Sequence, residues 1–144
     1  MESVKNKLIT VETTVKAPVN VAWSLWTEPK HITKWCYASD DWHAPRAEND
    51  LHVRGRFTTR MESKDGTSGF DFSGVYTRIE RNMVIEYSIA DGRKVKVHFT
   101  DQGPYTHVVE SFEPESENPA EMQKGGWQAI LDNYRRYVES KASD

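Results

Sequence analysis

The stretch NPAEMQKGGWQAILDNYRRYVE, residues 118–139, decides the fold, because its apolar residues recur three and four positions apart. Asn118, Pro119 and Glu121 have the residue types of a helix N-cap, a first helical position and a capping box. The apolar stripe that follows consists of Trp127, Ile130, Leu131, Tyr134 and Val138. We therefore predict a long C-terminal helix whose apolar stripe packs on a sheet.

Upstream of this helix the apolar period shortens to two residues, which is typical of half-buried strands. Alternation predicts strands within residues 8–17, 51–62, 69–80, 83–90, 93–100 and 105–113. The alternation changes phase within 69–80, which indicates a bulge near Ser73 and Gly74. After the first strand, Pro18 and Pro29 each open a short helix. Because every later connection is short enough for a hairpin, the sheet should be antiparallel and strongly curved.

Size, charge and apolar content narrow the class of protein. The 144 residues suit one domain, which we place at 1–144. A net charge of -3 gives no basic footprint for a phosphate backbone, so we expect no nucleic-acid partner. No stretch approaches the roughly 20 apolar residues of a membrane span, and the opening residues lack a signal-peptide core. A single cysteine, Cys36, forms no internal disulfide, and we expect a cytoplasmic protein.

The order of predicted elements is that of an α+β protein, and four stretches carry a resemblance to a known family. They are VETTVKAPVNVAWSLWTEPKHITKW (residues 11–35), GFDFSGVY (69–76), DGRKVKVHF (91–99) and GGWQAILDNYRRYVE (125–139). With these stretches the chain resembles the START-like or SRPBCC superfamily, and within it the family similar to the C-terminal domain of the Aha-type activator of the heat-shock chaperone ATPase. The resemblance implies the helix-grip fold, a curved antiparallel sheet of about six strands around a long C-terminal helix, with two short helices after strand one.

A curved sheet cannot close tightly along a whole helix, so we expect a cavity between the two. The large side chains on the predicted inner faces are the candidates for a ligand cavity: Trp35, Trp42, Phe57, Phe70, Phe72, Tyr76, Tyr87, Phe99, Trp127, Leu131 and Tyr134. We expect Asp41 and His43 at the mouth of this cavity. Core packing explains any single ring equally well. Gly125 and Gly126 cost helix stability and indicate a close approach or a bend.

Two polar groupings are candidates for chemistry. The acidic residues from Asp40 to Asp50, with His43, have the residue types of a metal or acid–base cluster, but their spacing matches no ligand template. We interpret them as a solvated turn and expect no metal and no cofactor. Cys36 with His31 or His43 could form an activated thiol, yet we favour a buried cysteine with His31 on the solvent side of its helix.

Two rows of basic residues alternate with the apolar positions of predicted strands. The rows are Arg54, Arg56 and Arg60, and Arg93, Lys94 and Lys96. Such rows can steer an anionic ligand or an acidic partner. We interpret both as the outer, solvated side of the sheet.

Three functions stay open, and binding is favoured over catalysis because no set of nucleophile, base and orienting group is visible. The leading hypothesis is a protein that binds a small hydrophobic molecule, such as a lipid, a polyketide or an aromatic metabolite. The resemblance also implies a protein-binding module that modulates the heat-shock chaperone ATPase. An enzyme of the cyclase or hydrolase kind is the third, since a cyclase can act chiefly by shaping its substrate.

Overall fold

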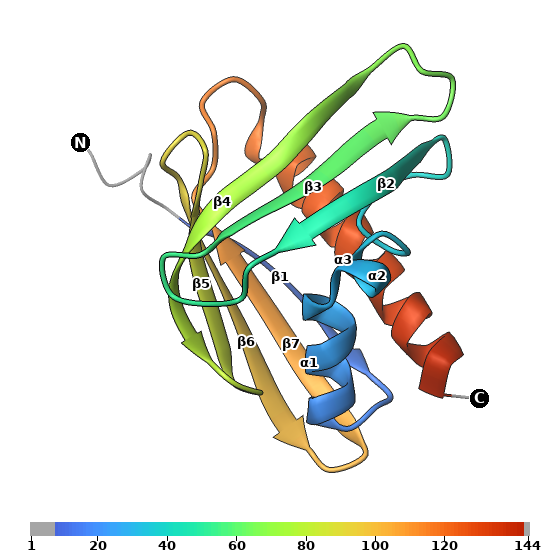
Figure 1. Cartoon of the computed structure of the whole chain (residues 1–144), viewed down its shortest axis with the longest axis vertical. Helices are drawn as coiled ribbons and strands as arrows, with labels where there is room; N and C mark the ends of the chain where they lie inside the picture. Colours follow the sequence, from blue (N-terminus) through green and yellow to red (C-terminus); the bar gives the residue numbers. More distant parts are fainter. Residues whose placement is uncertain (1–7, 143–144) are drawn as a thin grey trace.

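The computed structural model describes residues 8–142 and confirms the α+β helix-grip fold (Figure 1). The helices are α1 (Val19–Thr27), α2 (Pro29–Ile32) and α3 (Ala120–Ala142). The strands are β1 (Ile9–Val15), β2 (Trp42–Asn49), β3 (Arg56–Ser63), β4 (Gly69–Glu80), β5 (Val84–Ile89), β6 (Lys94–Gln102) and β7 (Tyr105–Phe112). The two short helices follow the first strand, as predicted.

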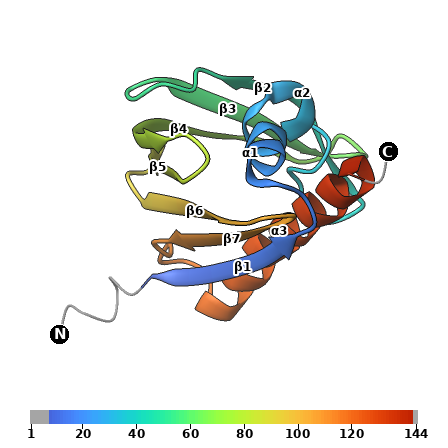
Figure 2. The same ribbon diagram turned by 90° about the horizontal axis from the view of Figure 1, so that it is seen from below.

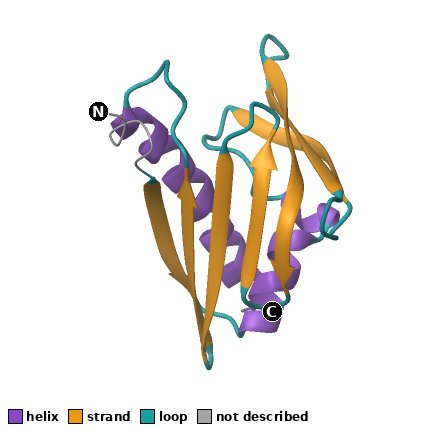
Figure 3. Cartoon of the chain, turned by 90° about the vertical axis from the view of Figure 1, so that its left-hand side faces the viewer, coloured by secondary structure: helices purple, strands orange, loops and turns teal. Residues whose placement is uncertain are grey.

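All strands belong to one antiparallel sheet with the order β1-β7-β6-β5-β4-β3-β2. Neighbours from β2 to β7 are consecutive in sequence, as hairpins require, and the first strand pairs with the last one. The sheet curls so that its two edges approach the helices from opposite sides (Figure 2). Figure 3 shows the helices of the described residues on one face of the sheet only. The core and any cavity therefore lie on the concave face.

Strand β2 was not predicted, and it raises the strand count above the expected six. It begins at Trp42 and forms one edge of the sheet, paired only with β3. Its register shifts between His43 and Arg46, around Pro45. Proline has no N–H for a ladder, and edge strands are where sheets accept it. The prediction of a solvated turn was wrong here because an edge strand with few apolar residues lacks the alternation of a half-buried strand.

The third strand begins later than predicted, at Arg56 instead of Leu51. Arg54 has a positive φ of 72°, and a Cβ at Gly55 would lie 2.2 Å from the carbonyl oxygen of Asp50. This tight turn separates β2 from β3, and only glycine fits at its centre.

The register shift in β4 lies between Tyr76 and Arg78, two residues beyond the predicted position. Gly74 has a different role. A Cβ there would lie 2.8 Å from the ring of Phe57 and 2.5 Å from the carbonyl oxygen of Ser88. The glycine thus leaves room for the Phe57 ring to lie across β4.

Helix α3 carries the predicted stripe, with Leu131, Tyr134 and Val138 fully buried. The N-cap differs from the prediction: the carbonyl of Pro119 accepts the first hydrogen bonds, while the Asn118 amide donates to Glu115. The buried Gln123 side chain donates to the carbonyls of Glu115 and Asn118 instead. This bonding fixes where the helix leaves β7 and so aims its stripe at the concave face.

Candidate functional site

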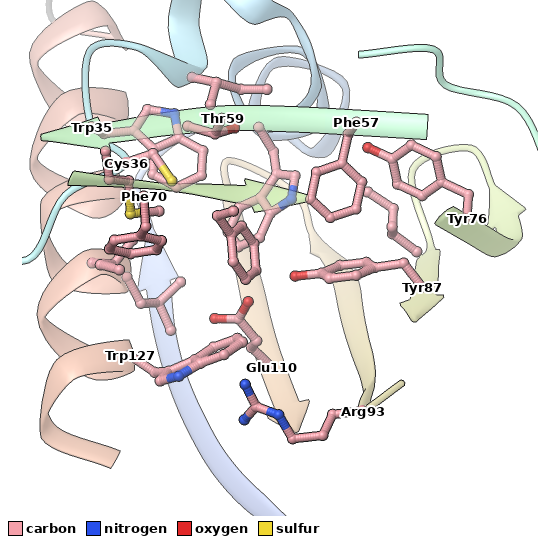
Figure 4. A pocket seen from close by; sticks show the side chains of 17 residues that line it. Trp35, Cys36, Phe57, Thr59, Phe70, Tyr76, Tyr87, Arg93, Glu110 and Trp127 are labelled. Atoms are coloured by element: carbon pink, nitrogen blue, oxygen red, sulfur yellow. The ribbon is translucent and has the colours of Figure 1, made fainter. Parts of the chain in front are cut away.

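A cavity of about 260 Å³ lies between α3, the α1–α2 region and the strands β3 to β7. Most of its wall is apolar. It is lined by Trp26, Ile32, Trp35, Cys36, Phe57, Thr59, Met61, Phe70, Phe72, Tyr76, Ile85, Tyr87, Arg93, Glu110, Trp127, Ile130 and Leu131. Figure 4 shows these side chains pointing inward from the helix on one side and the strands on the other.

Aromatic rings form one continuous wall along the strand side. The Phe57 ring meets the Tyr87 ring edge to face at 4.8 Å, and Phe72 bridges from Tyr87 to Trp127. Trp127 in turn stacks on Phe112 at 3.9 Å. Strand alternation places Phe57 and Tyr87 on the concave face, and the first turns of α3 bring Trp127 over the end of β7. The rings brace each other at the walls, so the space between them stays open.

The structure brings together most of the candidate cavity residues. The residues that line the cavity are Trp35, Phe57, Phe70, Phe72, Tyr76, Tyr87, Trp127 and Leu131. Their contact with a ligand stays a prediction.

Three candidates lie elsewhere in the core. Phe99 packs on Trp23 and Trp26, and Tyr134 donates a hydrogen bond of 2.6 Å to the carbonyl of Ala22. Trp42 is half-buried on β2, with its ring 6.1 Å from that of Phe70. None of the three belongs to the cavity lining.

Asp41 and His43, the predicted mouth residues, do not line the cavity either. The Asp41 carboxylate accepts a hydrogen bond from Ser39, and its carbonyl accepts one from Lys64 at the β3–β4 turn. His43 lies on the edge strand, 3.8 Å from Glu62. Both are tied to the rim of the sheet. Among residues 8–142, no three His, Cys, Asp or Glu side chains gather in a way that would hold a metal ion.

Glu110 is a cavity residue that the sequence reasoning missed. It projects inward from β7 between Val108 and Phe112 and is only 6% exposed. Within residues 8–142, its carboxyl group has no hydrogen bond and no ion pair. Burial raises the pKa of Glu110 from 4.5 to about 8. At neutral pH the group therefore holds its proton and can donate a hydrogen bond into the cavity. An acid at an inward position of an alternating strand was the available signal.

Arg93 is the second missed residue, and the prediction that it lies on the outer side of the sheet was wrong. It follows the positive-φ Gly92 in the β5–β6 turn, which swings its side chain back over the end of the sheet. Its Nε donates to Asp91 and its Nη1 to the carbonyl of Glu113. Figure 4 shows the guanidinium at the end of the cavity where Glu110 and Trp127 lie.

The other polar groups of the wall are neutral. Cys36 is buried, as the favoured interpretation held, and burial raises the pKa of its thiol to about 12, so the thiol is protonated at neutral pH. Burial likewise raises the pKa of Tyr76 and of Tyr87. Tyr76 donates to Asn49, whose amide donates to the carbonyl of Thr27. This chain of bonds ties the outer strands to α1 and holds the cavity wall in place.

His31 was predicted on the solvent side of its helix, and that prediction was wrong. Its Nδ1 lies 2.7 Å from the hydroxyl of Tyr137, and the two rings pack together. The pair clamps α2 to α3 outside the cavity, because neither residue belongs to its lining. No thiol–imidazole pair forms, since the Cys36 thiol has no imidazole partner within the described part of the chain.

The fold and the chain match known proteins. A solution structure from Aeromonas hydrophila, described as an AHSA1-like protein, shares 38% identity over 96% of each chain with a TM-score of 0.90. One from Cytophaga hutchinsonii shares 52% identity over 94% of each chain, with a TM-score of 0.79. A protein of unknown function from Staphylococcus aureus, 16% identical over 98% of this chain and 99% of that one, shares the fold with a TM-score of 0.71.

No protein of curated function matches the chain significantly. No helix within residues 8–142 is long and apolar enough to cross a membrane. The family described as Activator of Hsp90 ATPase homolog 1-like protein matches residues 16–139, from the end of β1 to the last turns of α3. The chain belongs to this family, whose START-like fold it has.

Proposed function

We propose that this protein binds a small, largely apolar molecule in the cavity between α3 and the sheet. One observation carries the proposal: an open, ring-lined space contains a buried carboxyl group that no side chain of residues 8–142 satisfies. A buried polar group without a partner costs free energy, and a ligand can supply the missing partner.

The size and walls of the cavity suit a compact ligand. Its volume of about 260 Å³ is slightly below the roughly 300–1,000 Å³ of most small-molecule sites. Its aromatic walls favour flat rings, which stack or meet edge to face with the side chains. A lipid with a long chain would exceed the space, so we favour a molecule of one or two rings.

Native mass spectrometry of protein purified gently from its own host tests the proposal directly. We expect a discrete adduct that denaturing extraction releases as a small aromatic compound. An Ile130→Trp variant, which fills the cavity from α3, should lack the adduct. An Arg136→Trp variant, which adds the same ring on the exposed side of α3, should keep it.

A consistently ligand-free mass, together with no thermal shift from any compound in a broad aromatic library, would contradict the proposal. Equal adducts in both tryptophan variants would show that the molecule binds outside the cavity. Each of these outcomes would contradict ligand binding in the cavity without contradicting the fold.

A second candidate function follows from the family match, whose description names an activator of the Hsp90 ATPase. In this case the protein would act as a binding module for the chaperone, with the cavity as part of its scaffold. The test is the steady-state ATPase rate of the host chaperone with and without the protein. An unchanged rate and no co-purification would remove this candidate.

A further inference from the structure

One end of the cavity differs chemically from the rest. Most of the wall is built of rings and aliphatic side chains, whereas Glu110 and Arg93 also line the cavity and are seen toward the end where Trp127 lies (Figure 4). Resting on the proposed function, we infer that this end recognises a carboxylate, and that the ligand is a compact aromatic acid. Its anion accepts a hydrogen bond from the Glu110 carboxyl group and faces the Arg93 guanidinium.

Among the buried polar side chains of residues 8–142, Glu110 has the only carboxyl group, and the buried hydroxyls of Thr59 and Tyr87 in the same lining likewise have no hydrogen bond. Thr27, Thr106 and Gln123 are equally buried, and each has a hydrogen-bond partner. Glu110 has none within residues 8–142, although its position on β7 places it opposite Val11 of β1 and Val97 of β6. These neighbours offer no polar atom on their side chains. The carboxyl group is therefore directed at the cavity, and a ligand atom is the partner that this geometry admits.

Arg93 is held in place with one part of its guanidinium still available. Nε donates to the Asp91 carboxylate at 2.9 Å, and Nη1 donates to the Glu113 carbonyl at 3.1 Å. No hydrogen bond from Nη2 is present within the described residues. Two bonds thus orient the group while a donor remains for a ligand. Arginine in such a fixed geometry is well suited to a carboxylate.

The charges around this end select among ligand classes. Arg93 is the only cation that residues 8–142 contribute to the lining, and Glu110 is neutral at neutral pH. The other titratable groups that face Glu110, Cys36 and Tyr87, are neutral as well, and so is Tyr76 beside Tyr87. Asp91 lies on the outer side of Arg93, where water screens it. A protonated amine would be repelled by the Arg93 guanidinium. An anion would be attracted by Arg93 and would accept a hydrogen bond from the Glu110 carboxyl group.

The proton on Glu110 makes binding dependent on pH. Below its pKa the carboxyl group donates to the ligand anion in a charge-assisted hydrogen bond. Above it the group becomes a carboxylate and repels the anion. The affinity for an acid should thus fall as the pH rises past about 8. By linkage, a bound anion raises the pKa of Glu110 further, while a bound cation would lower it.

Three probes of one size separate the ligand classes: naphthoic acid, acetonaphthone and naphthylmethylamine. They share the ring system and differ in the polar group, which is an anion, a neutral acceptor and a cation. Isothermal titration calorimetry on the full chain at neutral pH should give the highest affinity for the acid. We expect the ketone to bind roughly tenfold more weakly and the amine to bind more weakly still.

Two variants assign the effects to the two residues. Arg93→Gln should lower the affinity for naphthoic acid by roughly tenfold and leave the affinity for the ketone unchanged. The matched control is Arg78→Gln, which removes a cation that pairs with Glu80 and Glu86 outside the cavity and should leave both affinities unchanged. Glu110→Gln keeps a donor at every pH, so the loss of affinity above about pH 8 should disappear. Thermal unfolding checks that each variant folds.

An NMR titration of the Glu110 carboxyl carbon gives a readout that does not depend on variants. Binding of naphthoic acid should raise the pKa of Glu110. The inference is overturned if the acid binds no better than the ketone, if Arg93→Gln weakens both alike, or if the acid leaves the Glu110 pKa unchanged or lowers it. If none of the probes binds, both this inference and the proposed function fail. If the ketone or the amine binds best, the proposed binding function is supported, and only the inference that the ligand is a carboxylate is wrong.

Discussion

The two ends of the concave face contain the same kinds of residue. They differ in whether their polar side-chain groups have hydrogen-bond partners. At the closed end, Trp23 packs on Phe99 at 5.3 Å, Phe99 and Tyr134 pack on the inner side of Trp26 at 5.8 and 4.8 Å, and the Tyr134 hydroxyl donates to Ala22. At the cavity end, the rings touch only along the wall, and the Glu110 carboxyl group has no partner within residues 8–142.

The comparison shows that ring content alone does not distinguish a core from a ligand site. Both ends are rich in aromatic side chains, and both bury them. The difference lies in the polar groups, because a closed core satisfies its hydroxyls while a site keeps a donor for something else. We therefore expect stability to depend most on the closed end and binding to depend most on the cavity end.

The largest effect on stability should come from removing a ring at the closed end. Tyr134→Ala deletes a fully buried ring and the hydrogen bond to Ala22, so we expect a loss of ~3–5 kcal/mol in the free energy of unfolding. Phe72→Ala, at the half-buried cavity wall, should cost at least ~1 kcal/mol less. Urea unfolding measures both losses, and equal losses would contradict the expectation that stability depends most on the closed end.

An intermediate effect should come from Glu110, with a sign that depends on pH. The unfolded chain ionises this group near 4.5 and the folded protein near 8, so stability falls as the pH rises between those values. Glu110→Gln lacks this dependence. We expect the variant to match the wild type near pH 4.5 and to be more stable by ~2–4 kcal/mol at pH 8.

Urea unfolding at the two pH values measures this difference. Glu48→Gln, which removes an exposed carboxyl from β2, is the matched control and should show no comparable change. A difference between Glu110→Gln and the wild type that is the same at both pH values would show that folding does not raise the pKa of Glu110. The cavity end would then be as well satisfied as the closed end.

The smallest effect concerns the glycines of α3, for which the sequence indicates a close approach or a bend. A Cβ at Gly125 would meet no atom within 4 Å, so no protein atom of the described residues makes a close approach there. Gly125→Ala should stabilise the protein by ~0.5–1 kcal/mol through helix propensity, as measured by thermal unfolding. The same variant should bind aromatic probes unchanged, and a loss of binding would place Gly125 against the ligand.

The elements that the sequence predicted well are those with a strong period. Helix α3 and the strands β5, β6 and β7 have apolar residues at regular spacing, and the structure confirms them. Strand β2 was missed because an edge strand holding Pro45 is stabilised by its hydrogen bonds to β3 and not by alternating apolar residues. Its detection requires the partner strand, which local patterns do not contain.

The α+β class, the helix-grip fold and the family could be read from the chain alone, because periodicity and family motifs are local properties. The folded structure was needed to tell which rings enclose the cavity, since it set Phe99 and Tyr134 into the closed end and left Phe57 and Trp127 at the open one. The same holds for Glu110 and Arg93. Their place in one cavity lining depends on strand register and on the path of the β5–β6 turn, and both arise only when the sheet curls around α3.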